Sequence, residues 1–138
     1  MKGVLNCCSN LGALGIGKWV HTFIDRNGIQ VAGQGNALVD MYAKCGSMDD
    51  ALRVFGRMRT KDVYSYTSVI VGLATHGKAR KALNLFYEML EIGIQPNEVT
   101  FVGVLTACSH GGLVEEGHKL ADMAIDEAME FVEHYNGT

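Results

Sequence analysis

Apolar residues recur along the chain in blocks with helical spacing, and each block ends at a glycine. Four segments align, each with an apolar pair near its start and a buried-type residue one helical turn later: residues 2–12, 36–46, 67–77 and 102–112. Residues three or four positions apart lie on one face of a helix, so each segment predicts an amphipathic helix. Glycine readily adopts the left-handed conformation that ends a helix, so the closing glycines predict turns.

A second apolar pattern follows each closing glycine. A small residue comes five positions after the glycine, an aliphatic residue three positions later, and another apolar residue four positions after that. These intervals describe one face of a second helix. The small residues are Gly17, Ala51, Ala82 and Gly117. We expect them to allow close approach of the two helices in an antiparallel hairpin.

The closing glycines also define the period of the repeat. Gly12, Gly46, Gly77 and Gly112 are 34, 31 and 35 residues apart, and the first residues of the four segments repeat at the same intervals. A single helical hairpin cannot bury its apolar face, whereas stacked hairpins can. Since nothing in the pattern indicates strands, we expect one all-α domain, a right-handed α-solenoid of about four helix-turn-helix repeats.

Composition and charge narrow the function classes. Over 138 residues, 48% are hydrophobic and 20% are charged, which excludes a disordered tail. The net charge of −3 supplies no overall positive field, so any binding of nucleic acid must depend on local contacts. No segment has the ~20 apolar residues of a membrane span, and no signal or transit peptide is recognisable. Residues 1–5 resemble a helix interior without a cap residue, which indicates a truncated chain.

Candidate catalytic and metal-binding side chains form no known pattern. The four cysteines include no CxxC pair, and the five histidines lack an HxE or HExxH setting. We therefore expect reduced thiols, no metal, no cofactor and no enzymatic activity. Cys108 and His110 are two positions apart and point to different helix faces, which argues against a thiol nucleophile. Trp19 is expected to take part in core packing of the second helix of its hairpin, and a stacking platform is the alternative role.

These segments resemble the pentatricopeptide repeat (PPR) family, specifically the plant PLS subclass, whose repeats alternate among long, short and standard lengths. NALVDMYAKCGSMDDALRVFGRM resembles the short type, VYSYTSVIVGLATHGKARKALNLFYEMLEIGIQPN the standard type, and NEVTFVGVLTACSHGGLVEEG the long type. The tetratricopeptide array has a similar period, but its Trp-Leu-Gly-Tyr and terminal Pro signature is absent.

The resemblance divides the single array into four units. A partial long-type repeat covers residues 1–31, a short-type repeat 32–62 and a standard repeat 63–97. A long-type repeat with a divergent acidic C-terminal helix covers 98–138, and we expect this last helix to act as a polar end cap.

The resemblance also implies a function. A PPR fragment of this kind is expected to be a sequence-selective adaptor for single-stranded RNA, part of an RNA editing or processing factor in a mitochondrion or chloroplast. A deaminase or another processing protein would supply the chemistry in trans, with no membrane involved. A protein–protein interaction scaffold is the alternative, because helical solenoids support both roles.

The family reads a base with two side chains, the residue that opens the aligned segment and the residue that closes the repeat. By this resemblance Asn36 with Asp62 implies U, and Thr67 with Asn97 implies A. Amide, carboxylate and hydroxyl groups can all pair with the edge of a base. Helix N-capping is the alternative role for these four residues.

Two further positions are those at which the family sandwiches a base, and they hold Tyr64 and Val99. Stacking and apolar contact there contribute about 1–3 kcal/mol per base. The short-type unit has Gly33 at this position, which predicts a weaker sandwich. The long-type units have Val102 and Lys2 at the opening position. Val102 cannot form a hydrogen bond with a base, which predicts a spacer unit, and Lys2 is expected to be a solvated surface lysine.

Overall fold

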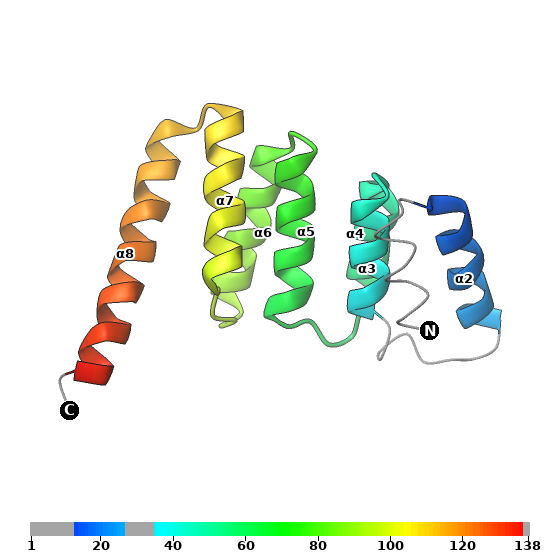
Figure 1. Cartoon of the computed structure of the whole chain (residues 1–138), viewed down its shortest axis with the longest axis horizontal. Coiled ribbons are helices and arrows are strands. Elements are labelled where there is room, and N and C mark those ends of the chain that lie inside the picture. Colours follow the sequence, from blue (N-terminus) through cyan, green and yellow to red (C-terminus); the bar gives the residue numbers. More distant parts are fainter. Residues whose placement is uncertain (1–12, 27–34, 137–138) are drawn as a thin grey trace.

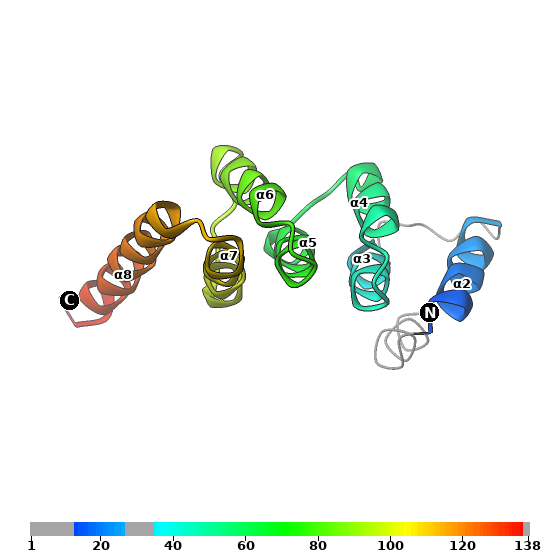
Figure 2. The same cartoon turned by 90° about the horizontal axis from the view of Figure 1, so that it is seen from above.

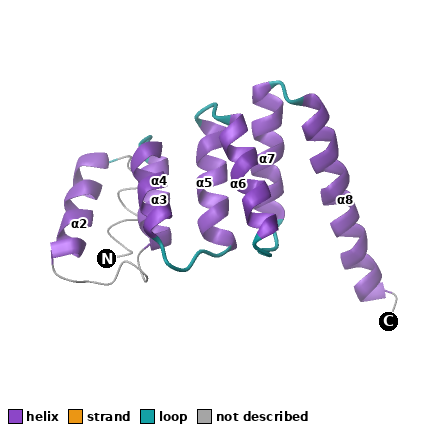
Figure 3. Ribbon diagram, turned by 180° about the vertical axis from the view of Figure 1, so that it is seen from behind, coloured by secondary structure: helices purple, strands orange, loops and turns teal. Residues whose placement is uncertain are grey.

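A computed structural model describes the backbone of residues 13–26 and 35–136. Within these ranges the chain forms seven helices and no strand (Figure 3). The helices are α2 (Leu14–Arg26), α3 (Gly35–Lys44), α4 (Met48–Arg57), α5 (Val63–Thr75), α6 (Ala79–Glu91), α7 (Glu98–Gly111) and α8 (Val114–Asn136). Lys2, Gly12, Gly33 and the first predicted helical segment lie outside the described residues.

The helices pair into hairpins that stack along one direction (Figure 1). Helix α3 packs against α4, α5 against α6, and α7 against α8, while α5 also packs against both α3 and α7. Viewed from above, α3, α5 and α7 lie in one row, called here the A row, and α4 and α6 lie in a second row (Figure 2). The predicted all-α solenoid of helix-turn-helix repeats is confirmed.

The predicted turns after the A-row helices are confirmed. Gly46, Gly77 and Gly112 have φ angles of 84°, 73° and 70°, in the left-handed region where a side chain would be strained. Gly93 has the same conformation, with φ at 87°, directly after Ile92, the C-cap residue of α6. This fourth turn was not predicted, because the repeat was defined by the glycines that follow the A-row helices.

The core is built from the repeated apolar positions. Leu38, Val39, Val69, Ile70 and Val104 are all fully buried in the A row. In the second helices of the hairpins, Ala51 and Ala82 are fully buried as well. A Cβ atom added at Gly17 would overlap the Met41 side chain, so this glycine allows α2 to approach α3 of the next hairpin, whereas the expected contact with the first helix of its own hairpin lies outside the described residues. Roughly 1.5–3 kcal/mol of stabilisation accompanies full burial of each large aliphatic side chain.

One prediction about an individual side chain is wrong. Trp19 does not pack in the core: it is 67% exposed and stacks on Phe23, with 5.9 Å between ring centroids. The buried face of α2 is formed by Gly17, Val20 and Ile24, and a residue at position 19 points away from that face.

None of the helices in the described ranges combines the length and apolarity needed to span a membrane.

The last helix is longer than the others and not simply polar. Helix α8 has 23 residues and extends beyond the N-terminal end of α7 (Figure 1). Its first turn carries Glu115 and Glu116, which suit the positive end of the helix dipole. It also exposes Ile125 and Met129, so its surface is not purely polar.

Candidate nucleic-acid interface

The start of α5 forms hydrogen bonds back to the start of α3. Asp62 is the N-cap of α5, and its Oδ1 accepts from the Ser65 backbone N–H at 3.0 Å, while the Asp62 N–H donates to Ser65 Oγ at 3.1 Å. Asn36 of α3 joins this capping box, because its Nδ2 donates to Asp62 Oδ1 at 3.3 Å and its Oδ1 accepts from Ser65 Oγ at 2.6 Å. We call Asn36, Asp62 and Ser65 the first junction.

The start of α7 repeats this arrangement against α5. Asn97 is the N-cap, and its Oδ1 accepts from the Thr100 backbone N–H at 3.0 Å, while the Asn97 N–H donates to Thr100 Oγ1 at 3.1 Å. The Thr67 Oγ1 atom lies 2.7 Å from Thr100 Oγ1. We call Thr67, Asn97 and Thr100 the second junction.

Both predicted pairs are therefore brought together, the first directly and the second through a hydroxyl group. Asp62 and Asn97 also cap helices, as the alternative interpretation proposed. Asn36 and Thr67 lie inside α3 and α5 and cap nothing. Capping occupies Oδ1 of Asn97 but leaves its Nδ2 without a hydrogen-bond partner among the described residues, so capping and base contact are compatible there.

The two N-cap residues differ in charge. Desolvation by itself would raise the pKa of Asp62, but hydrogen bonds from the Ser65 backbone, the Ser65 hydroxyl and Asn36 outweigh it and hold the pKa below its usual range. The first junction therefore presents a carboxylate at neutral pH, whereas the second presents a neutral amide.

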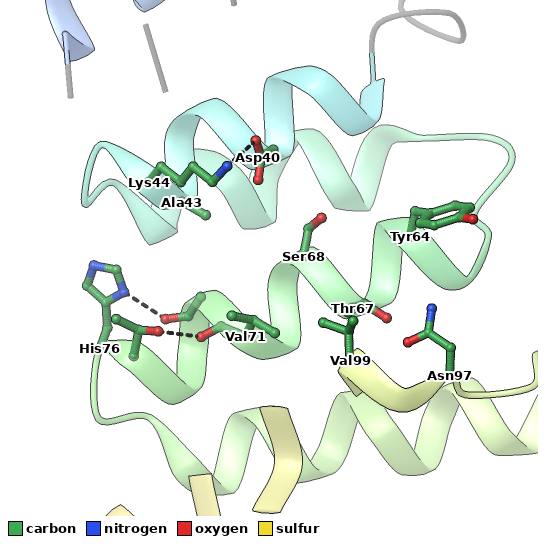
Figure 4. Close-up of a pocket in the computed structure, with 12 residues that line it drawn as sticks. Asp40, Ala43, Lys44, Tyr64, Thr67, Ser68, Val71, His76, Asn97 and Val99 are labelled. Carbon is green, nitrogen blue, oxygen red and sulfur yellow. Dashed lines mark hydrogen bonds and ion pairs between the residues drawn. The ribbon is translucent and has the colours of Figure 1, made fainter. Parts of the chain in front are cut away.

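A cleft of about 610 Å³ opens between α3, α5 and the start of α7 (Figure 4). Its lining includes four of the six predicted site residues, which are Tyr64, Thr67, Asn97 and Val99. The aromatic ring of Tyr64 and the side chain of Val99 are 65% and 57% exposed, so both offer apolar surface at the mouth of the cleft. Asn36 and Asp62 do not line this cleft.

The rest of the lining was not predicted from the sequence. From α3 come Asp40 and Lys44, joined by an ion pair of 3.2 Å, and from α5 come Ser68 and Val71, toward which the α3 residues face in Figure 4. The remaining lining residues are Ala43, Gly72, Thr75 and His76. No motif in the sequence indicates these residues, because their proximity depends on how α3 packs on α5.

The bridging hydroxyls of Ser65 and Thr100 were also not predicted, although a signal for them exists. Each follows its N-cap residue by three positions, in Asp-Val-Tyr-Ser and Asn-Glu-Val-Thr. A polar residue at the third helical position is typical of a capping box. The pattern would have placed the helix starts, but not the contacts with Asn36 and Thr67.

Other candidate side chains lie away from these contacts. Val102, the predicted spacer residue, is 63% exposed on α7. Burial raises the pKa of the Cys108 thiol, with a further contribution from Glu116, which disfavours the nucleophilic thiolate form. Within the described ranges, no group of His, Cys, Asp and Glu residues is arranged to hold a metal ion.

Comparison with protein families matches two stretches of the chain. Residues 61–110 match the PPR repeat family, and residues 36–63 match the PPR repeat. Together the two matches cover 75 of the 138 residues.

Curated relatives extend the similarity to most of the chain. The pentatricopeptide repeat-containing protein At1g50270 of Arabidopsis thaliana is 48% identical over 121 residues, which are 87% of this chain and 20% of that protein. Two others from the same plant, named as chloroplastic (At5g59200) and mitochondrial (At2g22410), are 50% and 46% identical over 83% and 82% of this chain. The matches cover 21% and 17% of those two proteins, so the chain spans about a fifth of the length of these relatives.

A solved structure shares the fold. The pentatricopeptide repeat protein PPR10, crystallised in complex with an 18-nt psaJ RNA element, superposes with a TM-score of 0.68 at 26% sequence identity. The superposition covers 80% of this chain and 17% of the PPR10 chain.

Proposed function

The chain belongs to the PPR repeat family, and from this premise we propose that its A row binds single-stranded RNA with one base at each junction. The observation that carries the proposal is the cleft beside α5, where Tyr64, Thr67, Asn97 and Val99 converge although 35 positions separate the first from the last. The similarity to a PPR protein crystallised with RNA supports the same use of this surface.

The second junction suits adenine. The exposed Tyr64 ring and the Val99 side chain flank the mouth of the cleft, and a base inserted between them gains stacking and apolar contact. The unpartnered Nδ2 of Asn97 can donate to an acceptor on the Watson–Crick edge, which adenine provides at N1. Thr67 then supplies the second polar contact.

The first junction suits uracil. The ionised carboxylate of Asp62 is an acceptor, and uracil carries an N3–H donor on its Watson–Crick edge. Asn36 lies 3.3 Å from the carboxylate and can contact a neighbouring atom of the same base. The expected target is therefore an RNA with adjacent U and A.

Among the residues that line the cleft, Lys44 is the one lysine or arginine that could contact an RNA phosphate. Lys44 lines the cleft with its side chain 55% exposed, and it is partly neutralised by Asp40. The net charge of the whole chain is −3. We therefore expect the logarithm of the association constant to fall with the logarithm of the salt concentration with a slope of about −1, much shallower than for a strongly basic protein.

The role of the longer protein follows the same proposal. Two junctions contact too few bases to define a site in a transcript. This chain therefore acts as part of a longer array, built of repeats like those at residues 32–62 and 63–97. Two relatives carry the words chloroplastic and mitochondrial in their names, which supports an organellar transcript as target. We place the protein in RNA editing or processing, with catalysis supplied by a partner such as a deaminase.

Fluorescence anisotropy with labelled eight-nucleotide RNAs tests the proposal. Oligonucleotides with adjacent U and A, in both orders within a cytidine background, should bind more tightly than scrambled ones. The Asn36→Ala/Thr67→Ala variant should lose this difference. Thr22→Ala/Asn84→Ala is the matched control, because it removes the same side-chain types from exposed sites on α2 and α6.

Absence of any sequence preference in the parent chain, or its survival in the Asn36→Ala/Thr67→Ala variant, would contradict the proposal. The scaffold alternative predicts this outcome, because a protein-binding solenoid has no reason to distinguish U and A from other bases.

A further inference from the structure

We propose that Ser65 and Thr100 determine which hydrogen-bonding group Asn36 and Thr67 present to a base, and that they thereby set the base preference of each junction. The inference rests on the proposed function and deepens it. Neither Ser65 nor Thr100 lines the cleft, so both are positioning residues that act through a neighbouring side chain.

Burial makes the proton positions in the junctions definite. In the described part of the chain, the buried polar side chains are Ser65, Thr67 and Thr100, exposed by 0%, 7% and 0%. All three belong to the junctions. A buried hydroxyl group is costly unless its hydrogen bonds are made, so the favoured arrangement is the one in which every hydroxyl proton has an acceptor.

At the first junction this condition fixes the orientation of an amide. Ser65 Oγ has one proton, and its shorter acceptor contact is Asn36 Oδ1 at 2.6 Å, against 3.0 Å for Asp62 Oδ1. The Asn36 carbonyl oxygen is thereby held toward Ser65, and one Nδ2 proton is directed to Asp62. The second Nδ2 proton remains, so Asn36 presents a donor.

That donor distinguishes the two pyrimidines. Uracil has a carbonyl oxygen at position 4, whereas cytosine has an amino group there. A donor from Asn36 pairs with the first and opposes the second. Ser65 thus favours U over C without touching the base.

At the second junction the requirement that every hydroxyl proton has an acceptor makes Thr67 an acceptor, whereas it makes Asn36 a donor at the first. If Thr67 donates to Thr100 Oγ1 at 2.7 Å, Thr100 can donate to Asn97 Oδ1 at 2.9 Å, and both protons have acceptors. The reverse order leaves the Thr67 proton without an acceptor in the described part of the chain. Thr67 therefore presents only lone pairs, and it is an acceptor.

That acceptor distinguishes the two purines. Adenine has an amino group at position 6, and guanine has a carbonyl oxygen there. Thr67 accepts from the first and is repelled by the second. The hydroxyl of Thr100 thus favours A over G, and one structural device yields a donor at one junction and an acceptor at the next.

The experiment measures two binding ratios by fluorescence anisotropy with the full chain and short RNAs. One is the affinity for U over C at the first position, and the other is the affinity for A over G at the second. Thr100→Val removes the hydroxyl and frees the Thr67 proton, so the A-over-G ratio should fall by about threefold to tenfold while the U-over-C ratio stays. Ser65→Ala should do the reverse.

Conservative and matched variants separate positioning from stability. Thr100→Ser and Ser65→Thr keep the hydroxyls and should keep both ratios. Thr106→Val makes the same exchange on α7 at a hydroxyl that bonds only the Val102 carbonyl, so it should change neither ratio. Circular dichroism at each step reports folding, and if Thr100→Val does not fold, the Ser65→Ala arm decides.

Two outcomes would overturn the inference, and they differ in what they mean for the proposed function. If folded Thr100→Val and Ser65→Ala are less stable but keep both ratios, the hydroxyls only cap helices and the inference is wrong while the proposed function stands. If the parent chain shows neither preference, the proposed function fails and this inference fails with it.

Discussion

At the first junction the carboxylate of Asp62 caps α5, whereas at the second junction the amide of Asn97 caps α7. The backbone plan is shared: an N-cap residue, a hydroxyl three positions later, and a side chain from the preceding A-row helix that bonds to that hydroxyl. The first junction is charged, through Asp62. The second is neutral and opens on the cleft with Tyr64 and Val99.

This difference separates what the fold needs from what recognition needs. Either Asp or Asn satisfies the unpaired N–H groups at a helix start. The fold therefore leaves the choice open, and the choice decides whether a base meets a carboxylate or an amide. Repeats can then vary their ligand chemistry at little cost in stability.

The largest expected effect concerns two core phenylalanines whose rings contact the residues that follow Ser65 and Thr100 in the sequence. Phe86 is fully buried, with its ring 5.7 Å from Phe101 of α7, so Phe86→Ala should lower the free energy of unfolding by about 3–5 kcal/mol. Phe55 lies 4.9 Å from the Tyr66 ring but has Lys61 over its face and is 6% exposed. We expect Phe55→Ala to cost less. Urea unfolding followed by circular dichroism measures both, and an equal or larger loss for Phe55→Ala would contradict the asymmetry.

The next effect concerns RNA binding at the cleft. Tyr64→Ala should weaken binding of U- and A-containing RNA by about 1–3 kcal/mol, because a stacked base loses its aromatic partner. Tyr64→Phe keeps the ring and should bind almost as tightly as the parent. Since Tyr64 is 65% exposed, neither variant should change the thermal midpoint appreciably. Equal binding by the Ala and Phe variants in anisotropy titrations would show that no base stacks there.

Removal of the caps compares the junctions directly. Asn97→Ala should lower the free energy of unfolding by about 1 kcal/mol, a normal value for an N-cap. Asp62→Ala should cost more, because Asp62 also accepts from Asn36 and its bonds are charge-assisted. Serine at either position restores a cap and should recover most of the loss. Denaturant midpoints at pH 7 give the ranking, and a greater loss for Asn97→Ala would reverse it.

Much of this fold could be predicted from the sequence because the same pattern of residues occurs in several aligned repeats. Gly46, Gly77 and Gly112 could be placed as turns since the same residue recurs at the same register. Prediction failed where this register was not compared across the units: the positions equivalent to Trp19 hold the polar residues Arg53, Asn84 and Lys119. Gly93 was missed, and Trp19 was assigned to the core although its register places it away from the buried face of α2.

The candidate site could be predicted only in part, for a different reason. The residue types at positions 36, 62, 67 and 97 are visible in the sequence, and so is the capping pattern that contains Ser65 and Thr100. The contacts between units are not visible, because they depend on how far each A-row helix is displaced along its neighbour. Helix packing decides this displacement, and it brings Lys44 beside the cleft as well.

The smallest effect is a pH dependence that only one junction should have. Hydrogen bonds from Ser65 and Asn36 hold the pKa of Asp62 below its usual range, against the opposing effect of desolvation. A depressed native pKa stabilises the folded state above the unfolded-state value of about 4, and this contribution is lost as the pH falls through the native pKa. Asn97 does not titrate, so the second junction makes no such contribution.

Two exchanges test this difference between the junctions. Asn caps helices about as well as Asp, so Asp62→Asn should keep the helix start while abolishing its pH dependence. The difference in unfolding free energy between the parent and Asp62→Asn should therefore be constant near neutral pH and shrink below about pH 4. Asn97→Asp should introduce the same acid sensitivity at the second junction. The pKa of Asp50 is also lowered, by the Ser47 hydroxyl, Lys18 and Arg53, but this carboxylate is present in all three proteins and cancels in the comparison. Urea midpoints from pH 3 to pH 7 measure the differences, and parallel curves for the parent and Asp62→Asn would mean that the first junction does not depend on charge.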